Sequence, residues 1–374
     1  MHKPASARRG IGNYTRNLTR AIVAAATERE TYLCVSRSGD AEGLGVPVEV
    51  RWPPKPGRMH WIWDSLFLRR KLEFLNLDFY HATDQMSVPR GMKQTRVLMH
   101  LHDVIPFLFW RQYAPSFPRD FRVGLRLSLR AAARVDAVIT DSECSKKDIV
   151  EWTGADPDRI HVVPFGCDEE FRPVEQLAER EAFLRSKQVT SPFILYVGAT
   201  DHRKNLPFLV RAFEQLRESG YPGSLYLIGE EFGWTHLAEV RKIHEEIGRS
   251  RCSEAIRMPG YVNSEELAMY LACADAFVFP SLYEGFGLPA LEAMSCGAAV
   301  VVSNRSSIPE VVGDAGLYFD PSSQDECVRQ LIAVTSDRAL RQELGRRGLQ
   351  RAKLFSWRRA AEQIFEIYRG LKSK

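Results

Sequence analysis

The stretch FVFPSLYEGFGLPALEAMSCG, residues 277–297, predicts a strand, a loop and a helix in succession. Its apolar start, flanked by Asp275 and Pro280, is typical of a short buried strand. Two glycines follow in the loop, Pro289 suits the first turn of a helix, and Gly297 suits its end. Backbone N–H groups and the helix dipole both favour a phosphate at such a place, so the stretch predicts an anion site.

Two carboxylates lie in the same stretch, with seven residues between them. Glu284 stands in the loop, and Glu292 stands about one turn inside the helix. An acid beside a phosphate site suggests a ligand with hydroxyl groups to hold, such as a sugar or a ribose. The alternative is a surface loop followed by an ordinary helix, in which an acidic residue near the N-terminus is favourable.

The wider pattern resembles the signature of retaining glycosyltransferases of family 4. The resemblance is carried by residues 281–297, by the AVVVS that ends at Ser303, and by the Pro-Glu-Val that begins at Pro309. These enzymes use nucleotide sugars, have the GT-B fold and share a Glu-x7-Glu motif. The resemblance extends over nearly the whole chain, residues 10–371, and is strongest over residues 260–320.

Composition indicates a globular protein of more than one domain. The chain has 374 residues, of which 45% are hydrophobic and 26% are charged, and two domains are expected at this length. No apolar run reaches the roughly 18 residues of a membrane span, and the start of the chain lacks the apolar core of a secretory signal. Seven scattered cysteines without a CxxC pair predict neither a zinc site nor a disulfide framework, and favour a cytoplasmic location.

Charge is distributed unevenly along the chain. Residues 1–140 contain 22 Lys and Arg against 12 Asp and Glu, whereas the remainder contains 29 against 35. Five arginines from Arg119 to Arg134 recur every three or four residues, which predicts one stripe along a helix over residues 117–135. The imbalance predicts an anionic partner for the amino half of the chain.

An aromatic and basic segment, residues 58–75 with Trp61 and Trp63, adds a second feature of proteins that lie on membranes. Together with the arginine stripe it predicts peripheral contact of the amino domain with the inner face of an anionic membrane. The alternative is that the tryptophans pack into the core and the arginines face water. A nucleic-acid partner is not expected, because the sequence has no helix-turn-helix pattern or RNA-binding aromatic signature.

The beginning of the chain, GIGNYTRNLTRAIV from residue 10, resembles the first loop and helix of the family. In the family a glycine at this helix start lets the backbone approach the donor diphosphate, and Gly12 matches that position. As a dinucleotide motif the run is weak, because the third glycine is missing. The family has a strand before this loop, whereas only nine residues precede Gly10, so we expect a sheet without its first strand or a start placed too late.

His102 and Asp103 stand at the carboxyl end of a predicted strand, where open α/β sheets bind ligands. Histidine is suited to proton transfer or hydroxyl contact near neutral pH. A structural His–Asp pair is the alternative. The pair and the Val-Ile-Pro that follows resemble the family's His-Asp loop, whose histidine lies at the cleft near the transferred sugar and the acceptor. The resemblance therefore implies a catalytic role for His102.

Arg203 and Lys204 stand between a predicted strand, residues 193–198, and a predicted helix that begins at Leu206. Adjacent cations at the carboxyl end of a strand suit a diphosphate, because arginine offers a planar fork and lysine a point charge. The alternative is an ordinary surface pair. The run YVGATDHRKNL around them resembles the family's phosphate-clamp loop, which implies that both side chains bind the donor.

The order of predicted elements indicates an α/β protein. Six strands alternate with helices in the carboxyl half and are expected to form a parallel Rossmann-like sheet. The resemblance implies the GT-B architecture, with two Rossmann-like parallel-sheet domains that face a cleft. The expected parts are an acceptor domain, residues 1–172, a nucleotide-sugar domain, residues 173–355, and a helix that returns to the first domain, residues 356–374.

The resemblance implies a retaining enzyme that moves a hexosyl group, preferably mannosyl, from a nucleoside-diphosphate sugar to a glycan or lipid-linked acceptor. GDP-mannose is the preferred donor, and a UDP-sugar is the second. Glu284 is expected to act in catalysis by holding donor-sugar hydroxyls, and Glu292 to reach the ribose or support the loop. The two cations and the backbone N–H groups of Phe286, Gly287 and Leu288 are expected to stabilise the departing diphosphate.

We expect neither a metal nor another cofactor, because no Asp-x-Asp motif stands at a cleft position. Substitutions of Glu284 or Lys204 are expected to leave the fold intact, since both positions lie in predicted loops. Two alternatives of the same fold stay open: a non-hydrolysing sugar-nucleotide epimerase, whose product forms without an acceptor, and a catalytically inactive protein that binds sugar nucleotides.

Overall fold

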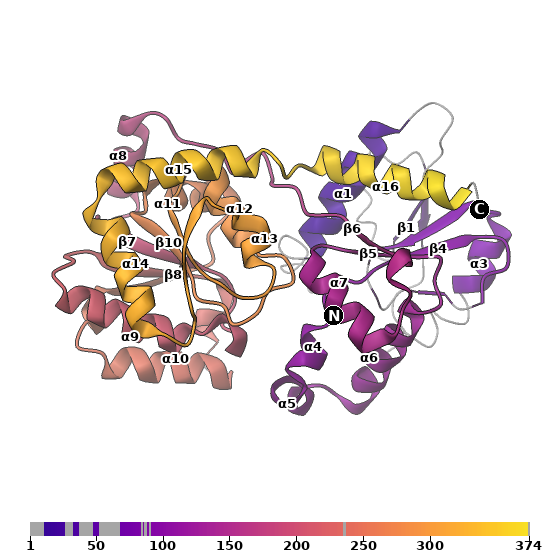
Figure 1. Ribbon diagram of the computed structural model, residues 1–374, viewed down its shortest axis with the longest axis horizontal. Coiled ribbons are helices and arrows are strands. Elements are labelled where there is room, and N and C mark those ends of the chain that lie inside the picture. Colours follow the sequence, from indigo (N-terminus) through magenta and orange to yellow (C-terminus); the bar gives the residue numbers. More distant parts are fainter. Residues whose placement is uncertain are drawn as a thin grey trace. The chain divides into compact units, whose positions relative to one another are not determined.

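The computed structural model describes residues 11–26, 33–36, 48–51, 68–83, 85, 88–89, 91–234 and 237–372. The described chain divides into two compact units: unit 1, which ends at Gly166 and resumes at Phe355, and unit 2, which runs from Cys167 to Leu354. Each unit is built on a parallel sheet with helices around it (Figure 1). The predicted α/β class with two parallel-sheet domains is confirmed.

Unit 1 contains a parallel sheet of four strands and a separate parallel pair. The sheet order is β3 (Phe79–Ala82), β4 (Arg96–His100), β5 (Ala137–Thr140) and β6 (Ile160–Val162). The pair is formed by β1 (Leu33–Ser36) and β2 (Val48–Arg51). Because all the neighbouring strands in the larger sheet are parallel, the loops that follow them meet at one edge.

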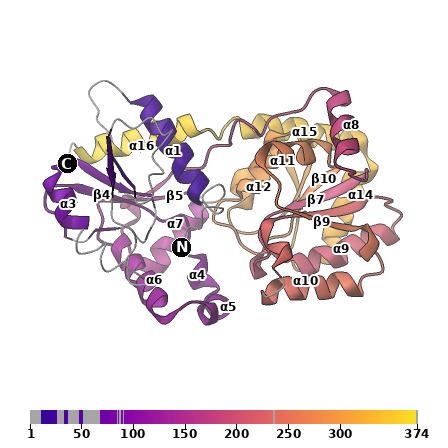
Figure 2. The ribbon, with the colours of Figure 1, turned by 180° about the vertical axis from the view of Figure 1, so that it is seen from behind.

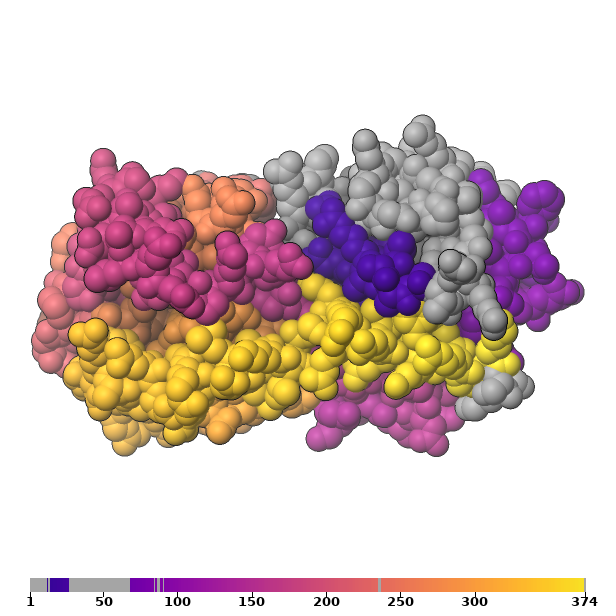
Figure 3. All heavy atoms as spheres, turned by 90° about the horizontal axis from the view of Figure 1, so that it is seen from above, coloured from indigo at the N-terminus to yellow at the C-terminus, as the bar shows by residue number. Residues whose placement is uncertain are grey.

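Helices of unit 1 come from both ends of the chain. They are α1 (Ile11–Ala25), α3 (Arg69–Phe74), α4 (Ile105–Leu108), α5 (Trp110–Tyr113), α6 (Arg119–Ala132), α7 (Glu143–Thr153) and α16 (Trp357–Lys372). Figure 3 shows α1, in indigo, beside α16, in yellow. Tyr14 and Leu18 of α1 pack in one buried cluster with Ala361 and Ile364 of α16, so the last helix is part of the core of unit 1.

Two helices of unit 1 show how local sequence sets their ends and faces. Helix α6 begins directly after Pro118, whose ring has no N–H to leave unpaired, and buries Leu125 and Leu129. Helix α7 begins after Ser142, whose hydroxyl accepts a hydrogen bond from the Ser145 backbone N at 3.0 Å. The predicted helix over residues 117–135 is confirmed, with observed bounds of Arg119–Ala132.

Unit 2 is a six-stranded parallel sheet with helices on both faces (Figure 2). The sheet order is β12 (Gly316–Phe319), β11 (Val300–Ser303), β10 (Ala276–Phe279), β7 (Phe193–Val197), β8 (Ser224–Ile228) and β9 (Ile256–Gly260). The chain builds outward from β7 to β9, returns to place β10 beside β7, and then builds outward to β12. The reversal between β7 and β10 is the topological switch point, where open α/β sheets bind ligands.

Helices of unit 2 form two layers, one on each face of the sheet. One layer contains α9 (Leu206–Glu218), α10 (Ala238–Arg249) and α14 (Gln324–Ser336), and the other contains α8 (Leu177–Ser186), α11 (Ser264–Cys273), α12 (Leu288–Ser295), α13 (Ile308–Val312) and α15 (Arg338–Ala352). Every residue of β7 and β10 is buried, as expected for strands that are covered on both faces.

Several predictions concern residues outside the described part of the chain. Of the aromatic and basic segment over residues 58–75, the structure describes the part from Leu68 onward, with α3 at Arg69–Phe74. Trp61, Trp63 and the residues before Ile11 lie outside it. No helix in the described ranges is both long enough and apolar enough to cross a membrane.

Candidate active site

The loops after β7 and β10 bring three of the predicted site residues together at the switch point. These strands are neighbours in the sheet, so their carboxyl ends lie side by side. A 3-10 turn over His202–Lys204 follows β7, and the Asp201 carboxylate begins it by accepting a hydrogen bond from the Arg203 backbone N at 3.0 Å. The backbone N of Leu282, after β10, donates to the Arg203 carbonyl O at 2.7 Å, which joins the two loops.

Glu284 contacts both predicted cations. Its Oε1 accepts a hydrogen bond from Lys204 Nζ at 2.7 Å, and its Oε2 accepts one from Arg203 at 2.5 Å. The Lys204 ammonium also lies 5.1 Å from the centre of the Phe279 ring, a cation–π distance. Lys204 is 5% exposed and Glu284 is 6% exposed, so these groups form an interior ion cluster and not a surface pair.

The electrostatics of the cluster keep Glu284 ionised. Burial by itself raises the pKa of Glu284, but the charges of Arg203 and Lys204 and the hydrogen bond from Lys204 outweigh burial and lower that pKa to about 2. The pKa of Lys204 is lowered, because burial and then the charge of Arg203 disfavour its ammonium more than Glu284 favours it. An anion brought to this site would therefore stabilise the charged lysine.

Serines after β11 hold the Glu284 loop. The Glu284 backbone N donates to Ser306 Oγ at 2.8 Å. The Ser307 hydroxyl lies 2.9 Å from the carbonyl oxygens of both Glu284 and Phe286. Sequence reasoning missed these serines, although Ser303-Asn-Arg-Ser-Ser307 follows a strand that ends at the same sheet edge. They fix the backbone of the loop and thereby position the Glu284 carboxylate.

Helix α12 presents its N-terminus after this loop. Gly287 precedes its first residue, Leu288, and has a φ of 102°, a left-handed conformation that glycine adopts without steric cost. Gly287 has no side chain that could cap this helix end, and Pro289 has no N–H to satisfy. The predicted N–H donors of Phe286, Gly287 and Leu288 thus lie at the positive end of the helix dipole.

Glu292 is half-buried in the second turn of α12. Burial raises the pKa of the Cys167 thiol, and the charge of Glu292 raises it further. Its contact with the donor ribose stays a prediction.

His102 lies in unit 1, just past the end of β4, and hydrogen-bonds to a buried carboxylate. Its Nδ1 is 2.9 Å from Oδ2 of Asp141, which follows the neighbouring strand β5 and is 2% exposed. The Thr140 hydroxyl donates to the His102 carbonyl O at 3.1 Å. Asp103 has a local role, because its Oδ1 accepts a hydrogen bond from the Ile105 backbone N at 2.9 Å where α4 begins.

Asp141 is shared by two histidines. His100, which is fully buried, has its Nε2 3.4 Å from Asp141 Oδ1 and its ring 4.6 Å from the ring of His102. The Tyr14 hydroxyl of α1 lies 2.9 Å from the same Nε2. Burial by itself raises the pKa of Asp141, but the charge of His102 and the hydrogen bonds from both histidines outweigh burial and lower that pKa. An ionised Asp141 favours the His102 tautomer with its proton on Nδ1, which leaves the lone pair on Nε2.

Sequence reasoning missed Tyr14, His100 and Asp141. The available signal was weak, because Asp141-Ser142 fits a helix cap and His100 fits a buried strand position. Gly12, two residues before Tyr14, occupies the second position of α1 and is half-buried. Its approach to the donor diphosphate stays a prediction.

One group of side chains in the described part of the chain has ligand atoms close enough to hold a metal ion. His100, His102 and Asp141 each offer an atom within 4.8 Å of the others. In this structure His102 Nδ1 hydrogen-bonds to Asp141 Oδ2, and His100 Nε2 lies 2.9 Å from the Tyr14 hydroxyl, so a cation would have to displace the Nδ1 proton of His102. We interpret the group as a hydrogen-bond network, and independence from metal stays a prediction.

Comparison with known proteins matches almost the whole chain. Residues 8–171 match the family described as Glycosyltransferase Family 4, and residues 179–351 match Glycosyl transferases group 1. O-antigen chain mannosyltransferase B of Escherichia coli is 34% identical over 296 residues, which are 79% of this chain and 75% of that protein. The serotype-specific mannosyltransferase WbdA of Escherichia coli is 33% identical over 294 residues, 76% of this chain and 35% of that longer protein. The solved structure of Anabaena Alr3699/HepE with UDP-glucose has a TM-score of 0.74 at 18% identity and covers 96% of each chain.

Two parallel-sheet domains of this kind make up the GT-B fold, which this chain shares with that structure. The chain belongs to glycosyltransferase family 4. The predicted family, fold and glycosyltransferase activity are confirmed.

Proposed function

We propose that the protein transfers a mannosyl group from GDP-mannose to a glycan or lipid-linked acceptor with retention of configuration at the anomeric carbon. The observation that carries this proposal is the buried cluster of Arg203, Lys204 and Glu284 at the switch point of unit 2. The mannosyltransferases among the relatives support the sugar. The UDP-glucose on a structural neighbour keeps a UDP-sugar as the second candidate.

In this proposal the cluster stabilises the departing diphosphate. Negative charge grows on the leaving group as the glycosidic bond breaks, and preorganised donors stabilise it most at that moment. Arg203, Lys204 and the N–H groups at the start of α12 supply those donors without a metal ion. Because the pKa of Lys204 is lowered by burial and by Arg203, its ammonium gains more from an incoming diphosphate than a solvated lysine would.

Glu284 has two tasks in this proposal. It holds both cations in place, which uses one lone pair on each oxygen. A carboxylate has about four acceptor positions, so the others can accept hydrogen bonds from donor-sugar hydroxyls. Its negative charge also favours the positive charge that develops on the sugar ring in the transition state.

His102 acts on the sugar or the acceptor in this proposal. The Asp141 carboxylate holds its Nδ1 proton, and the stacked His100 ring restricts its orientation. Nε2, which carries the lone pair, is then the nitrogen that accepts a hydroxyl proton. Gly12 allows close approach of backbone to the diphosphate, and Glu292 contacts the ribose.

We further propose that unit 1 lies against the inner, cytoplasmic face of an anionic membrane. Arg119, Arg126, Arg130 and Arg134 of the α6 stripe are exposed. Within the described residues, no carboxylate forms an ion pair with any arginine of this stripe. Each basic side chain near an anionic surface contributes roughly 1 kcal/mol, so four together support reversible attachment.

A donor panel tests the catalytic proposal. The purified protein is incubated with GDP-mannose, GDP-fucose, UDP-glucose and UDP-galactose, and release of nucleoside diphosphate is measured. We expect GDP-mannose to be consumed at least about tenfold faster than the others, and NMR of the product to show the anomeric configuration of the donor. No release from any donor would contradict a transferase, faster use of a UDP-sugar would change the donor, and an altered sugar nucleotide without an acceptor would indicate an epimerase.

A further inference from the structure

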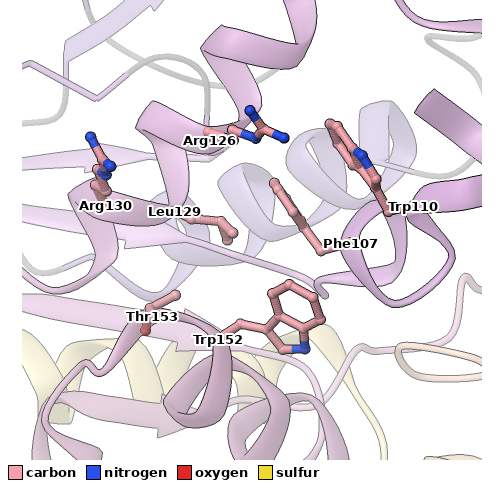
Figure 4. A pocket seen from close by; sticks show the side chains of 7 residues that line it. All are labelled: Phe107, Trp110, Arg126, Leu129, Arg130, Trp152 and Thr153. Carbon is pink, nitrogen blue, oxygen red and sulfur yellow. The ribbon is translucent and has the colours of Figure 1, made fainter. Parts of the chain in front are cut away.

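A cavity of about 380 Å³ opens on unit 1 beside the arginine stripe. Its floor and walls come from α4, α5, α6 and the end of α7 (Figure 4). Phe107 and Leu129 form an apolar floor, and each is 7% exposed. The Trp110 ring stacks on Phe107 at 5.6 Å, and Trp152, across the cavity, is 45% exposed.

The charged side chains at this cavity are unpaired cations. Arg126 and Arg130 lie one turn apart on α6 and are exposed, and no described carboxylate forms an ion pair with either of them. The Arg126 guanidinium lies 5.0 Å from the centre of the Trp110 ring. Side chains four apart on a helix are neighbours, so two guanidiniums can contact one anionic group.

The neutral polar side chain of the lining, Thr153, already has its hydrogen-bond partners within the protein. The Thr153 hydroxyl donates to the Ile149 carbonyl O at 2.6 Å and accepts from the Ala155 backbone N at 3.1 Å. The remaining polar groups of the lining side chains are guanidinium and indole N–H donors, which favour an acceptor-only ligand. A sugar or a nucleobase needs side chains that accept as well as donate, whereas a phosphate with a hydrocarbon chain needs only donors and an apolar wall.

We propose that this cavity binds a phosphate-bearing membrane lipid, with the phosphate on Arg126 and Arg130 and the first part of the hydrocarbon chain against Phe107, Leu129 and Trp152. Val123, one turn before Arg126 on α6, is 48% exposed and extends the apolar surface beside the cations. This inference deepens the proposed function. It rests on that function only where it identifies the bound lipid as the carrier of the acceptor. Lipid binding itself is independent of sugar transfer.

Chain length gives the first test. The full protein is titrated by calorimetry with prenyl monophosphates of five, ten and fifteen carbons, and with inorganic phosphate and glucose 1-phosphate. If the chain enters the cavity, each added methylene should tighten binding by about fourfold until the cavity is full. Equal affinity for all chain lengths, or equal binding of glucose 1-phosphate, would overturn the lipid assignment, and displacement by a single-stranded oligonucleotide would replace it with a nucleic-acid site.

Matched variants give the second test. Arg126→Gln and Arg130→Gln are compared with Arg134→Gln, which makes the same charge change two residues past the end of α6 and outside the lining. We expect each lining variant to weaken prenyl phosphate binding about tenfold, the scale of one charged hydrogen bond, and Arg134→Gln to leave it unchanged. Trp152→Ala should weaken binding without any change of charge. Equal losses in all three arginine variants with no effect of Trp152→Ala would indicate surface attraction and contradict the cavity.

A vesicle experiment tests whether the cavity binds a lipid that is part of a membrane. Co-sedimentation uses neutral phosphatidylcholine vesicles with and without phosphatidic acid, and circular dichroism confirms that each variant is folded. We expect binding to require phosphatidic acid and to fall in the lining variants more than in Arg134→Gln. Donor consumption is measured on the same samples, so loss of lipid binding with intact GDP release separates this inference from the proposed transfer reaction. Equal pelleting with neutral vesicles would contradict it.

Discussion

Glu284 in unit 2 and Asp141 in unit 1 are both buried carboxylates that follow parallel strands, yet they have different partners. Glu284 lies between an arginine and a lysine, whereas Asp141 lies between two histidines. In both cases the neighbours outweigh burial and lower the pKa of the carboxyl group. Arginine is charged at any ordinary pH, and histidine is charged only at acidic pH. Glu284 is therefore part of a permanently charged site, whereas Asp141 is part of a network that can exchange protons.

Removing a cation or the carboxylate from the unit 2 cluster should have the largest effect on turnover. We expect Lys204→Ala and Glu284→Gln each to lower turnover by about a hundredfold or more, the scale of one preorganised charge-stabilising group. The measurement is GDP release at saturating donor. Lys187→Ala, which removes a half-exposed lysine paired with Glu266, is the matched control and should be near normal. Near-normal turnover in either cluster variant would remove the assignment.

The same substitutions should also affect folding. Because both residues lie in predicted loops, the sequence predicted that the fold would tolerate these substitutions. In the structure, however, Lys204 and Glu284 are buried. Breaking a buried ion pair typically costs about 3–5 kcal/mol, because the remaining charge loses its partner. We therefore expect Glu284→Gln to have a lower free energy of unfolding in urea than the unchanged protein, and activity should be measured well below its midpoint. An unchanged midpoint would mean that water reaches the cluster.

Removing the charge at Asp141 should have a smaller effect. We expect Asp141→Asn to lower kcat about ten- to a hundredfold, at or below the lower end of acid–base contributions, with little change in the KM for the donor. The reason is that the amide no longer fixes the Nδ1–H tautomer of His102. Nitrogen NMR of the labelled imidazole should show a changed tautomer population. A variant with lower kcat and an unchanged tautomer would assign Asp141 a structural role only.

Stability at acidic pH should distinguish the two units. Burial lowers the pKa of His100 from 6.5 to about 4 and that of His81 from 6.5 to about 3. The unfolded chain therefore binds more protons in this range, so unit 1 is most stable above pH 6.5 and loses stability as pH falls towards 4. Each histidine contributes about 1.4 kcal/mol per pH unit.

Glu284 behaves differently over the same range. Its pKa is lowered from 4.5 to about 2, so its contribution is complete above pH 4.5 and is lost progressively as pH falls from 4.5 through 2. Hydrogen exchange measured by mass spectrometry at pH 7, 6 and 5, corrected for the intrinsic rate, should show loss of protection in unit 1 first. His81→Leu should reduce that pH dependence. Equal loss in both units would contradict the contrast.

Chelation should have the smallest effect. Fixed cations in unit 2 are expected to do the work of a metal ion on the diphosphate, so EDTA should leave turnover within about twofold of the untreated enzyme. The assay is GDP release after dialysis against chelator. Complete loss that Mg²⁺ or Mn²⁺ restores would place an ion at the donor site or at the group around Asp141.

Much of the fold could be predicted from the sequence. Apolar runs such as residues 276–279, followed by glycine and a helix signal, predicted the strands and helices of unit 2, and the six-stranded parallel sheet is confirmed. Prediction was weaker in unit 1, where His100 fits a strand core and Asp141 fits a helix cap equally well. Local patterns carry no information on which loops meet, so these residues were not identified as parts of one network.

The sequence by itself determined the elements, the family and the chemical types of the site residues, because periodicity and motif spacing are local properties. Tertiary structure decided which of them touch. The reversal of strand order between β7 and β10 is what brings Glu284 to Arg203 and Lys204, which lie 81 and 80 positions earlier in the sequence. Tertiary structure also determined which groups are buried. It therefore determined that the Glu284 carboxylate stays permanently charged and that the Asp141 carboxylate shares protons with histidine.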